Sequence, residues 1–156
     1  MNIESVGVLG AGQMGNGIAQ VAACAGFQVT MVDIKQEYVD KGLAAIERSL
    51  GKLVAKERMS EQDAASALAR VSISTDKTAV SDSDLVVEAI PEIPDLKFST
   101  FAELDGICKP STILASNTSS ISINEIAAAT SRPERVIGMH FMNPVPIMKL
   151  VEIING

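Results

Sequence analysis

Histidine and cysteine are scarce in this chain, which has one histidine, His140, and two cysteines, Cys24 and Cys108. The cysteines are far apart in the sequence, and neither has a second cysteine or a histidine at metal-ligand spacing. A zinc site is therefore not expected, and we predict no metal centre of any kind. The two cysteines are predicted to be buried thiols of a protein in a reducing cytosol.

A basic cluster and a long apolar run are also missing. The chain has 13 Lys and Arg against 19 Asp and Glu, and its formal net charge is −6. Because nucleic acids and anionic membranes attract clustered basic residues, neither is expected as a partner. No apolar run approaches the ~20 residues of a membrane span, and the N-terminus lacks the basic stretch and cleavage site of a signal peptide. We therefore expect a cytoplasmic protein.

Short apolar runs alternate with helical patterns along the whole chain. Its 156 residues, 47% hydrophobic and 21% charged, are typical of one globular domain spanning residues 1–156. Strands are predicted at residues 6–10, 28–33, 71–74, 84–90, 112–117, 135–140 and 149–154. Helices are predicted between the first two strands, over 36–56, after an N-cap at Ser60, over about 95–108 and near 123–130. This alternation predicts a Rossmann-type, doubly wound α/β fold with a mostly parallel sheet and an antiparallel C-terminal strand.

The sequence GAGQMG at residues 10–15 matches the G-x-G-x-x-G pattern. The pattern alone is weak, but here it follows a predicted strand and opens a predicted helix, as in dinucleotide-binding proteins. Gly10 would allow the tight turn, and Gly12 would let a pyrophosphate approach the backbone. Gly15 would let the helix pack close to the strand.

The residues around this turn favour NAD as the cofactor. Amides near Gln13 and Met14 would face the phosphates at the positive end of the helix. Asp33 ends the next predicted strand and can accept hydrogen bonds from ribose hydroxyls, while its charge would repel a 2′-phosphate. Lys35 lies nearby and weakens that preference for NAD over NADP. A glycine-rich turn that binds nothing, a flavin site and a nucleotide sensor are the alternatives.

The single histidine lies where such a fold would place catalytic chemistry. His140 ends a predicted strand, and the sequence NPVP after it breaks the chain. An antiparallel return would bring Glu152 beside the imidazole. Histidine can accept the proton of an alcohol near neutral pH, and a carboxylate would fix its tautomer and stabilise the imidazolium. Taken alone, the histidine would instead be interpreted as a buried polar residue of the core.

Three stretches, ASNTSS (115–120), HFMNPVPIMKLVEII (140–154) and VVEAIPE (86–92), resemble the NAD-binding domain of the 3-hydroxyacyl-CoA dehydrogenases. The resemblance spans essentially the whole chain and is strongest to the bacterial 3-hydroxybutyryl-CoA dehydrogenases of butyrate metabolism. It implies oxidation of a (3S)-3-hydroxyacyl-CoA to the 3-oxoacyl-CoA, or the reverse, with NAD as the hydride partner. It also implies fatty acid metabolism as the setting, and it assigns His140 and Glu152 as the catalytic pair.

The resemblance extends to further residues of the site. Ser119 corresponds to a serine that holds the substrate 3-oxygen, although helix capping by one of residues 117–120 is the alternative. Asn143 corresponds to a residue near the nicotinamide, although it also suits an Asn-Pro turn. Glu92 and Lys97 correspond to residues that contact NAD, whereas the sequence alone predicts that Lys97 is an ordinary exposed helix lysine.

Substrate binding and assembly are implied by the resemblance as well. Ser49 and Lys56 lie two helical turns apart on one face, which in the family meets the acyl-CoA; without the family this face would be assigned to solvent. Members of the family are nearly twice this length. Their second, helical domain closes the substrate cleft and provides most of the dimer contact. We therefore expect that this domain is absent from the chain and that the full-length enzyme is a homo-oligomer through it.

Two other functions remain open from the sequence. The chain as given can be an NAD-binding module without activity of its own. It can also resemble the dehydrogenases of small free β-hydroxyacids, whose glycine turn also contains Met-Gly but which rely on a lysine. No lysine occurs here in matching context, so the acyl-CoA substrate is favoured.

Overall fold

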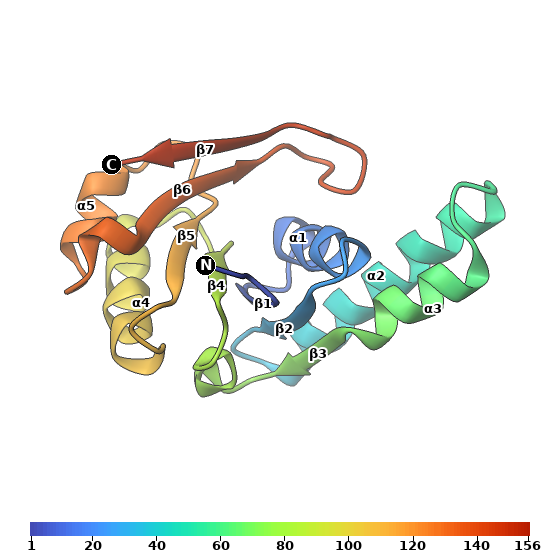
Figure 1. Ribbon diagram of the computed structural model, residues 1–156, viewed down its shortest axis with the longest axis horizontal. Helices are drawn as coiled ribbons and strands as arrows, with labels where there is room; N and C mark the ends of the chain where they lie inside the picture. The colour runs from blue at the N-terminus through green and yellow to red at the C-terminus, as the bar shows by residue number, and fades with distance from the viewer.

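The protein is described by a computed structural model that covers residues 1–156 (Figure 1). The elements in chain order are β1 (Ser5–Leu9), α1 (Gln13–Cys24), β2 (Gln28–Val32), α2 (Gln36–Ala55), α3 (Glu61–Ala69), β3 (Val71–Ser74), η1 (Lys77–Val80), β4 (Leu85–Glu88), α4 (Pro94–Ile107), β5 (Ile113–Ser116), α5 (Ile123–Ala128), η2 (Pro133–Arg135), β6 (Val136–Phe141) and β7 (Val151–Asn155). Every predicted strand and helix is present within a few residues of its expected bounds. The short 3₁₀ helices η1 and η2 were not predicted.

The strands form one seven-stranded sheet in the order β3-β2-β1-β4-β5-β6-β7. All neighbouring strands pair in parallel except β6 and β7, which are antiparallel. The predicted Rossmann-type fold with an antiparallel final strand is therefore confirmed. The strand order reverses between β1 and β4, and ligands of such sheets bind at the carboxyl ends of the strands beside that reversal.

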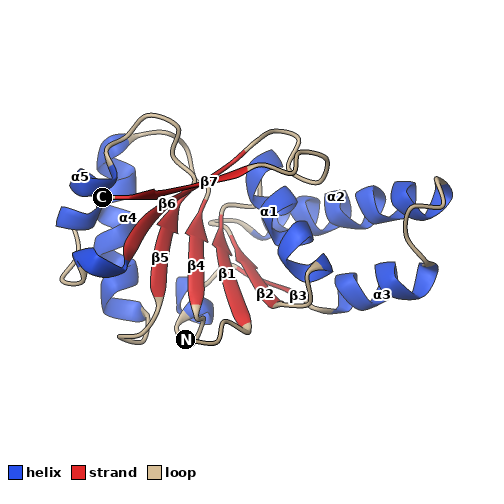
Figure 2. Ribbon diagram, turned by 45° about the horizontal axis from the view of Figure 1, so that its top comes forward, coloured by secondary structure: helices blue, strands red, loops and turns tan.

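Helices cover both faces of the sheet, which explains why its strands are apolar on both sides. In β1, Val8 belongs to a core cluster with Ile18 of α1 and Ile46 of α2. The neighbouring Leu9 belongs to a second cluster with Phe101 of α4. Figure 2 shows α1, α2 and α3 beside the β1–β3 half of the sheet, and α4 and α5 beside the β4–β6 half.

The turn after β1 requires glycine at two positions. Gly10 has φ +99°, a left-handed conformation that L side chains rarely adopt, and a Cβ there would lie 2.5 Å from the Ala89 carbonyl oxygen. A Cβ on Gly15 would lie 1.8 Å from the Gly10 carbonyl oxygen. The close packing of α1 against the end of β1 therefore depends on both residues.

Helices α2 and α3 form a hairpin that projects from the rest of the molecule (Figure 1). Ser60 caps α3 as predicted, because its hydroxyl oxygen accepts a hydrogen bond from the Asp63 amide at 3.0 Å. No second hydrogen bond from the Ser60 amide to the Asp63 carboxylate completes a capping box.

The prediction of two buried thiols is half wrong. Cys108 is buried, but Cys24 is exposed. Cys24 is the last residue of α1, and Ala25 and Gly26 after it are exposed as well, so this end of the helix is not covered by other elements. The chain contains no helix that is both long and apolar enough to span a membrane.

Candidate functional site

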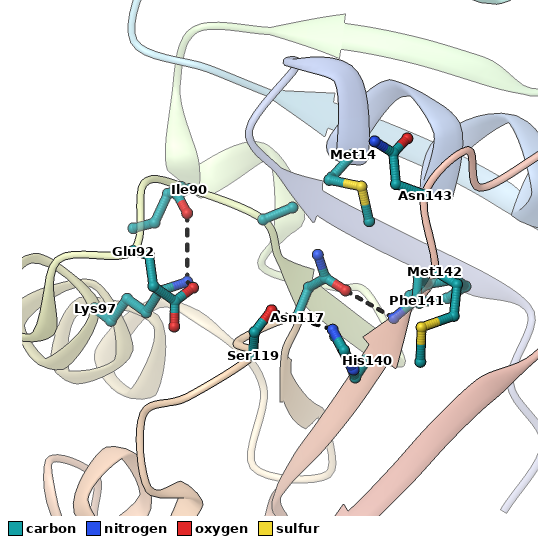
Figure 3. A pocket seen from close by; sticks show the side chains of 11 residues that line it. Met14, Ile90, Glu92, Lys97, Asn117, Ser119, His140, Phe141, Met142 and Asn143 are labelled. Atoms are coloured by element: carbon teal, nitrogen blue, oxygen red, sulfur yellow. Dashed lines mark hydrogen bonds and ion pairs between the residues drawn. The ribbon is translucent and has the colours of Figure 1, made fainter.

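A continuous groove follows the carboxyl edge of the sheet where the strand order reverses. One part of it, with a volume of about 660 Å³, is lined by the glycine turn, Asp33 and Tyr38. The other part, of about 330 Å³, is lined by Ser119 and His140 (Figure 3). Both parts share Met14, Ala89 and Ile90, so the glycine turn and the histidine lie along one groove.

The glycine turn is joined to the end of β2 through the side chain of Asp33. One carboxylate oxygen accepts a hydrogen bond from the Ala11 amide at 2.8 Å, and the other accepts one from the Ile34 amide at 2.7 Å. The amides of Gln13 and Met14, in the first turn of α1, have no acceptor within the protein. Free amides at the positive end of a 12-residue helix provide hydrogen-bond donors for an anion.

The histidine and the glutamate meet as predicted. His140 and Glu152 face each other in the antiparallel register of β6 and β7, and the imidazole Nδ1 lies 3.0 Å from the Glu152 Oε2. The Ser119 Oγ lies 3.1 Å from Nε2 on the other side of the ring. Because an ionised carboxylate only accepts hydrogen bonds, the neutral ring carries its proton on Nδ1, and Nε2 accepts from Ser119. Nε2 is thus the basic nitrogen, and it borders the groove.

The loop between β6 and β7 is attached to the start of α1. The Asn143 side-chain oxygen accepts a hydrogen bond from the Gln13 side-chain amide at 3.2 Å, and the Asn143–Pro144 peptide bond is cis. Asn143 lines the groove together with His140 (Figure 3). Asn143 therefore links this loop to α1 and also borders the site.

Asn117 was missed as a site residue. Its side-chain oxygen accepts a hydrogen bond from the Phe141 amide at 2.8 Å, which joins the loop after β5 to the residue next to His140. From the sequence, Asn117 was considered only as one of the possible helix caps at residues 117–120, and that alternative is wrong because Ser122 occupies the N-cap position of α5. The position of Asn117 at the carboxyl end of a predicted strand was the available signal.

Lys97 is not the exposed helix lysine that the sequence alone predicts. Its side chain is 1% exposed, and its ammonium lies 2.5 Å from the Glu88 Oε1 and 3.5 Å from the Glu92 Oε2. Partial burial raises the pKa of Glu92, but a hydrogen bond from Thr118 and the charge of Lys97 outweigh it and hold that pKa below its usual value. Glu92 and Lys97, which the resemblance assigns to contact with NAD, both line the groove, and Glu88 behind them was missed.

Ser49 and Lys56 are not brought into the groove. Ser49 lies in α2 and Lys56 is the C-cap of that helix, on the projecting hairpin, and neither lines either part of the groove. No group of three or more His, Cys, Asp or Glu side chains is arranged to hold a metal ion.

Comparisons with known proteins agree with one another. Residues 5–156 match the family described as "3-hydroxyacyl-CoA dehydrogenase, NAD binding domain". A probable 3-hydroxybutyryl-CoA dehydrogenase of Bacillus subtilis is 52% identical over 156 residues, which cover 100% of this chain and 54% of that protein. A 3-hydroxybutyryl-CoA dehydrogenase of Bradyrhizobium diazoefficiens is 49% identical over 99% of this chain and 53% of that protein.

The fold is shared with solved structures as well. The crystal structure of (S)-3-hydroxybutyryl-CoA dehydrogenase from Ralstonia eutropha superimposes with a TM-score of 0.97 at 52% identity, over 99% of this chain and 55% of that one. The chain thus spans about half the length of the curated relatives it matches.

Proposed function

Because this chain belongs to the 3-hydroxyacyl-CoA dehydrogenase family, as its NAD-binding domain, we propose that it binds NAD and supplies the acid/base for oxidising a (3S)-3-hydroxyacyl-CoA or reducing the 3-oxoacyl-CoA. The names of its relatives favour 3-hydroxybutyryl-CoA as the substrate and butyrate or fatty acid metabolism as the setting. The observation that carries the proposal is the Ser119–His140–Glu152 arrangement at the groove.

The groove fits a dinucleotide. Gly12 has no atom within 4 Å of the position of a Cβ, so the backbone of the turn is open to the groove. Together with Gly10 and Gly15, the free amides of Gln13 and Met14 would hold the pyrophosphate, and Asp33 has further acceptor capacity for ribose hydroxyls. Glu92, Lys97 and Asn143 would hold the nicotinamide half. NAD, when bound, supplies the acceptor for the hydride that leaves the substrate carbon.

His140 would handle the proton of the same reaction. As the C–H bond gives up its hydride, the hydroxyl proton passes to Nε2, the basic nitrogen at the groove. Glu152 would hold the ring in this tautomer and stabilise the imidazolium, and Ser119 would hold the 3-oxygen by a hydrogen bond. In the direction of reduction the imidazolium returns the proton to the oxygen.

The contacts with the acyl-CoA and the assembly of subunits are proposed from the resemblance to the family. Ser49 and Lys56 would meet the CoA from the projecting hairpin, where the lysine ammonium can pair with a phosphate. We propose that the native protein has a helical domain beyond this one, which completes the substrate cleft and joins subunits. The free state of both cysteines supports a cytoplasmic location.

The test is His140→Gln in the full-length native protein. Turnover of acetoacetyl-CoA with NADH should fall about 10²–10⁴-fold, while the dissociation constant of NADH measured by calorimetry stays within about twofold of the parent. Glu152→Gln should lower turnover in the same direction and also leave NADH binding intact. Near-normal turnover by His140→Gln would exclude the acid/base role.

NMR spectroscopy of the His140 ring nitrogens tests the tautomer assigned above without any measurement of turnover. His140 is the only histidine of residues 1–156, so in a polypeptide of these residues the two nitrogen resonances of its ring are assigned without ambiguity. The neutral ring should carry its proton on Nδ1 in the parent, and Glu152→Gln should reduce this preference. A parent ring protonated on Nε2 would contradict the assigned roles.

Since the chain spans half the length of its relatives, we propose that residues 1–156 alone bind NADH but turn over substrate slowly. Rapid reduction of acetoacetyl-CoA by these residues alone would refute this. Assaying acetoacetate beside acetoacetyl-CoA separates an acyl-CoA dehydrogenase from one that acts on small free β-hydroxyacids.

A further inference from the structure

A buried carboxylate lies directly behind the groove. Glu88, the last residue of β4, has a fully buried side chain, and it is paired with the almost equally buried Lys97 of α4. The proton and hydride steps described above do not use Glu88. Buried ion pairs seldom stabilise a fold more than apolar residues of the same size would, so a pair at this place invites a functional explanation.

Both oxygens of Glu88 are occupied. Oε1 accepts hydrogen bonds from the Lys97 ammonium at 2.5 Å and from the Ile90 amide at 2.9 Å. Oε2 accepts one from the Ser116 hydroxyl at 2.7 Å, and the Ser116 Oγ accepts from the Thr118 amide at 3.2 Å. The carboxylate therefore connects the loop after β4, helix α4 and the loop that carries Ser119.

Lys97 depends on this carboxylate for its position. Its ammonium also donates to the Ile90 carbonyl at 3.3 Å and lies 3.5 Å from Glu92, whose side chain is 41% exposed. Glu88 is thus the nearer and more rigid of the two anionic partners. Without its charge, the flexible lysine side chain would be free to turn toward Glu92 and solvent.

We propose that Glu88 is a positioning residue of the cofactor site, which holds the Lys97 ammonium at the wall of the groove where the nicotinamide half of NAD would bind. The inference rests on the proposed function. Glu88 lies behind the wall of the groove and would act on the cofactor only through Lys97. It predicts that loss of the Glu88 charge weakens cofactor binding as much as loss of the Lys97 side chain does.

The test is a double-mutant cycle of Glu88→Gln, Lys97→Met and the pair together, in the native protein. Each single variant leaves one buried charge without its partner, and its Tm should fall by roughly 6–20 °C. In the double variant neither charge remains. The glutamine at position 88 can still accept a hydrogen bond from the Ile90 amide and donate one to the Ser116 hydroxyl oxygen. The Tm of the double variant should return close to that of the parent.

NADH binding should follow a different pattern. All three variants should bind NADH about 10–100-fold more weakly than the parent, because each loses the same charge-assisted hydrogen bond. ADP, which lacks the nicotinamide half, should bind all four proteins alike. Lys109→Met, which removes a partner of Asp84 away from the groove, is the matched control and should lower only stability.

The double variant shows whether NADH affinity follows the charged pair or overall stability, and Glu88→Gln, which keeps Lys97, tests the positioning role itself. If either of these two variants binds NADH as tightly as the parent does, the inference is overturned. Equal loss of ADP and NADH affinity would indicate general distortion and would overturn it as well. A parent that binds neither NADH nor ADP would instead refute the proposed function, and with it the inference.

Discussion

Gly12→Ala should separate cofactor binding from folding. Gly12 is the N-cap of α1 with φ −66° and ψ −170°, values that alanine adopts without strain. An added Cβ would have no neighbour within 4 Å. Alanine is a poorer N-cap than glycine, but it also restricts the unfolded chain, so the free energy of unfolding should change by no more than about 1 kcal/mol.

Gly12 lines the groove beside Gln13 and Met14, whose amides are free, so the added methyl group would occupy space at that wall. If the pyrophosphate binds there, the methyl group prevents its close approach and costs one or more charge-assisted hydrogen bonds, each worth about 1.5–3 kcal/mol. The dissociation constant of NADH should therefore rise about 10–100-fold or more. Calorimetric titration with NADH measures this, and urea unfolding of the same samples measures stability.

Two other glycines serve as controls. Gly15→Ala would place a Cβ 1.8 Å from the Gly10 carbonyl oxygen and should disrupt folding and binding together. Gly106 is exposed in α4 with open space around it, so Gly106→Ala should raise stability by about 0.5–1 kcal/mol and leave NADH binding unchanged. The reasoning is refuted if Gly12→Ala binds NADH as tightly as the parent, or unfolds as readily as Gly15→Ala.

Two further predictions concern stability at polar clusters away from the groove. The Lys109 ammonium and nearby backbone amides hold the pKa of Asp84 well below its usual value, so its ionised form stabilises the native state above the unfolded pKa, and this contribution is lost as the pH falls. Asp84→Asn should therefore lower the urea midpoint at neutral pH, with a deficit that shrinks from about pH 5 toward about pH 2; a constant deficit would contradict this. The Arg132 guanidinium donates to the Asp105 carboxylate and to the Cys108 carbonyl at the end of α4, at 2.6 and 3.1 Å. Arg132→Met should lower the free energy of unfolding by about 2–4 kcal/mol, and a loss under about 0.5 kcal/mol would show that these bonds contribute little.

The fold was predictable because its signals are local. Alternating apolar runs and helical periodicity follow from which side chains each element must bury, and these patterns located every strand and every α-helix. The glycine turn was equally accessible, since the positive φ of Gly10 and the close approach at Gly15 are backbone requirements that few other residues meet. The pairing of His140 with Glu152 followed once the last strand was predicted to return antiparallel, because directly opposite residues of two strands place their side chains on the same face of the sheet.

The polar interior of the site was decided only by the tertiary structure. Lys97 was assigned to solvent from the sequence, yet it is buried, because its ammonium meets Glu88 from a different element nine residues away. Cys24 is exposed and Asn117 borders the groove for the same reason: burial depends on which neighbouring elements cover a position. The sequence by itself determined the elements, their order and the identity of the acid/base candidate. Long-range packing alone determined which charges were removed from water and paired. The free energy of burying a charge depends on its hydrogen-bonding and ionic partners, which no local pattern specifies.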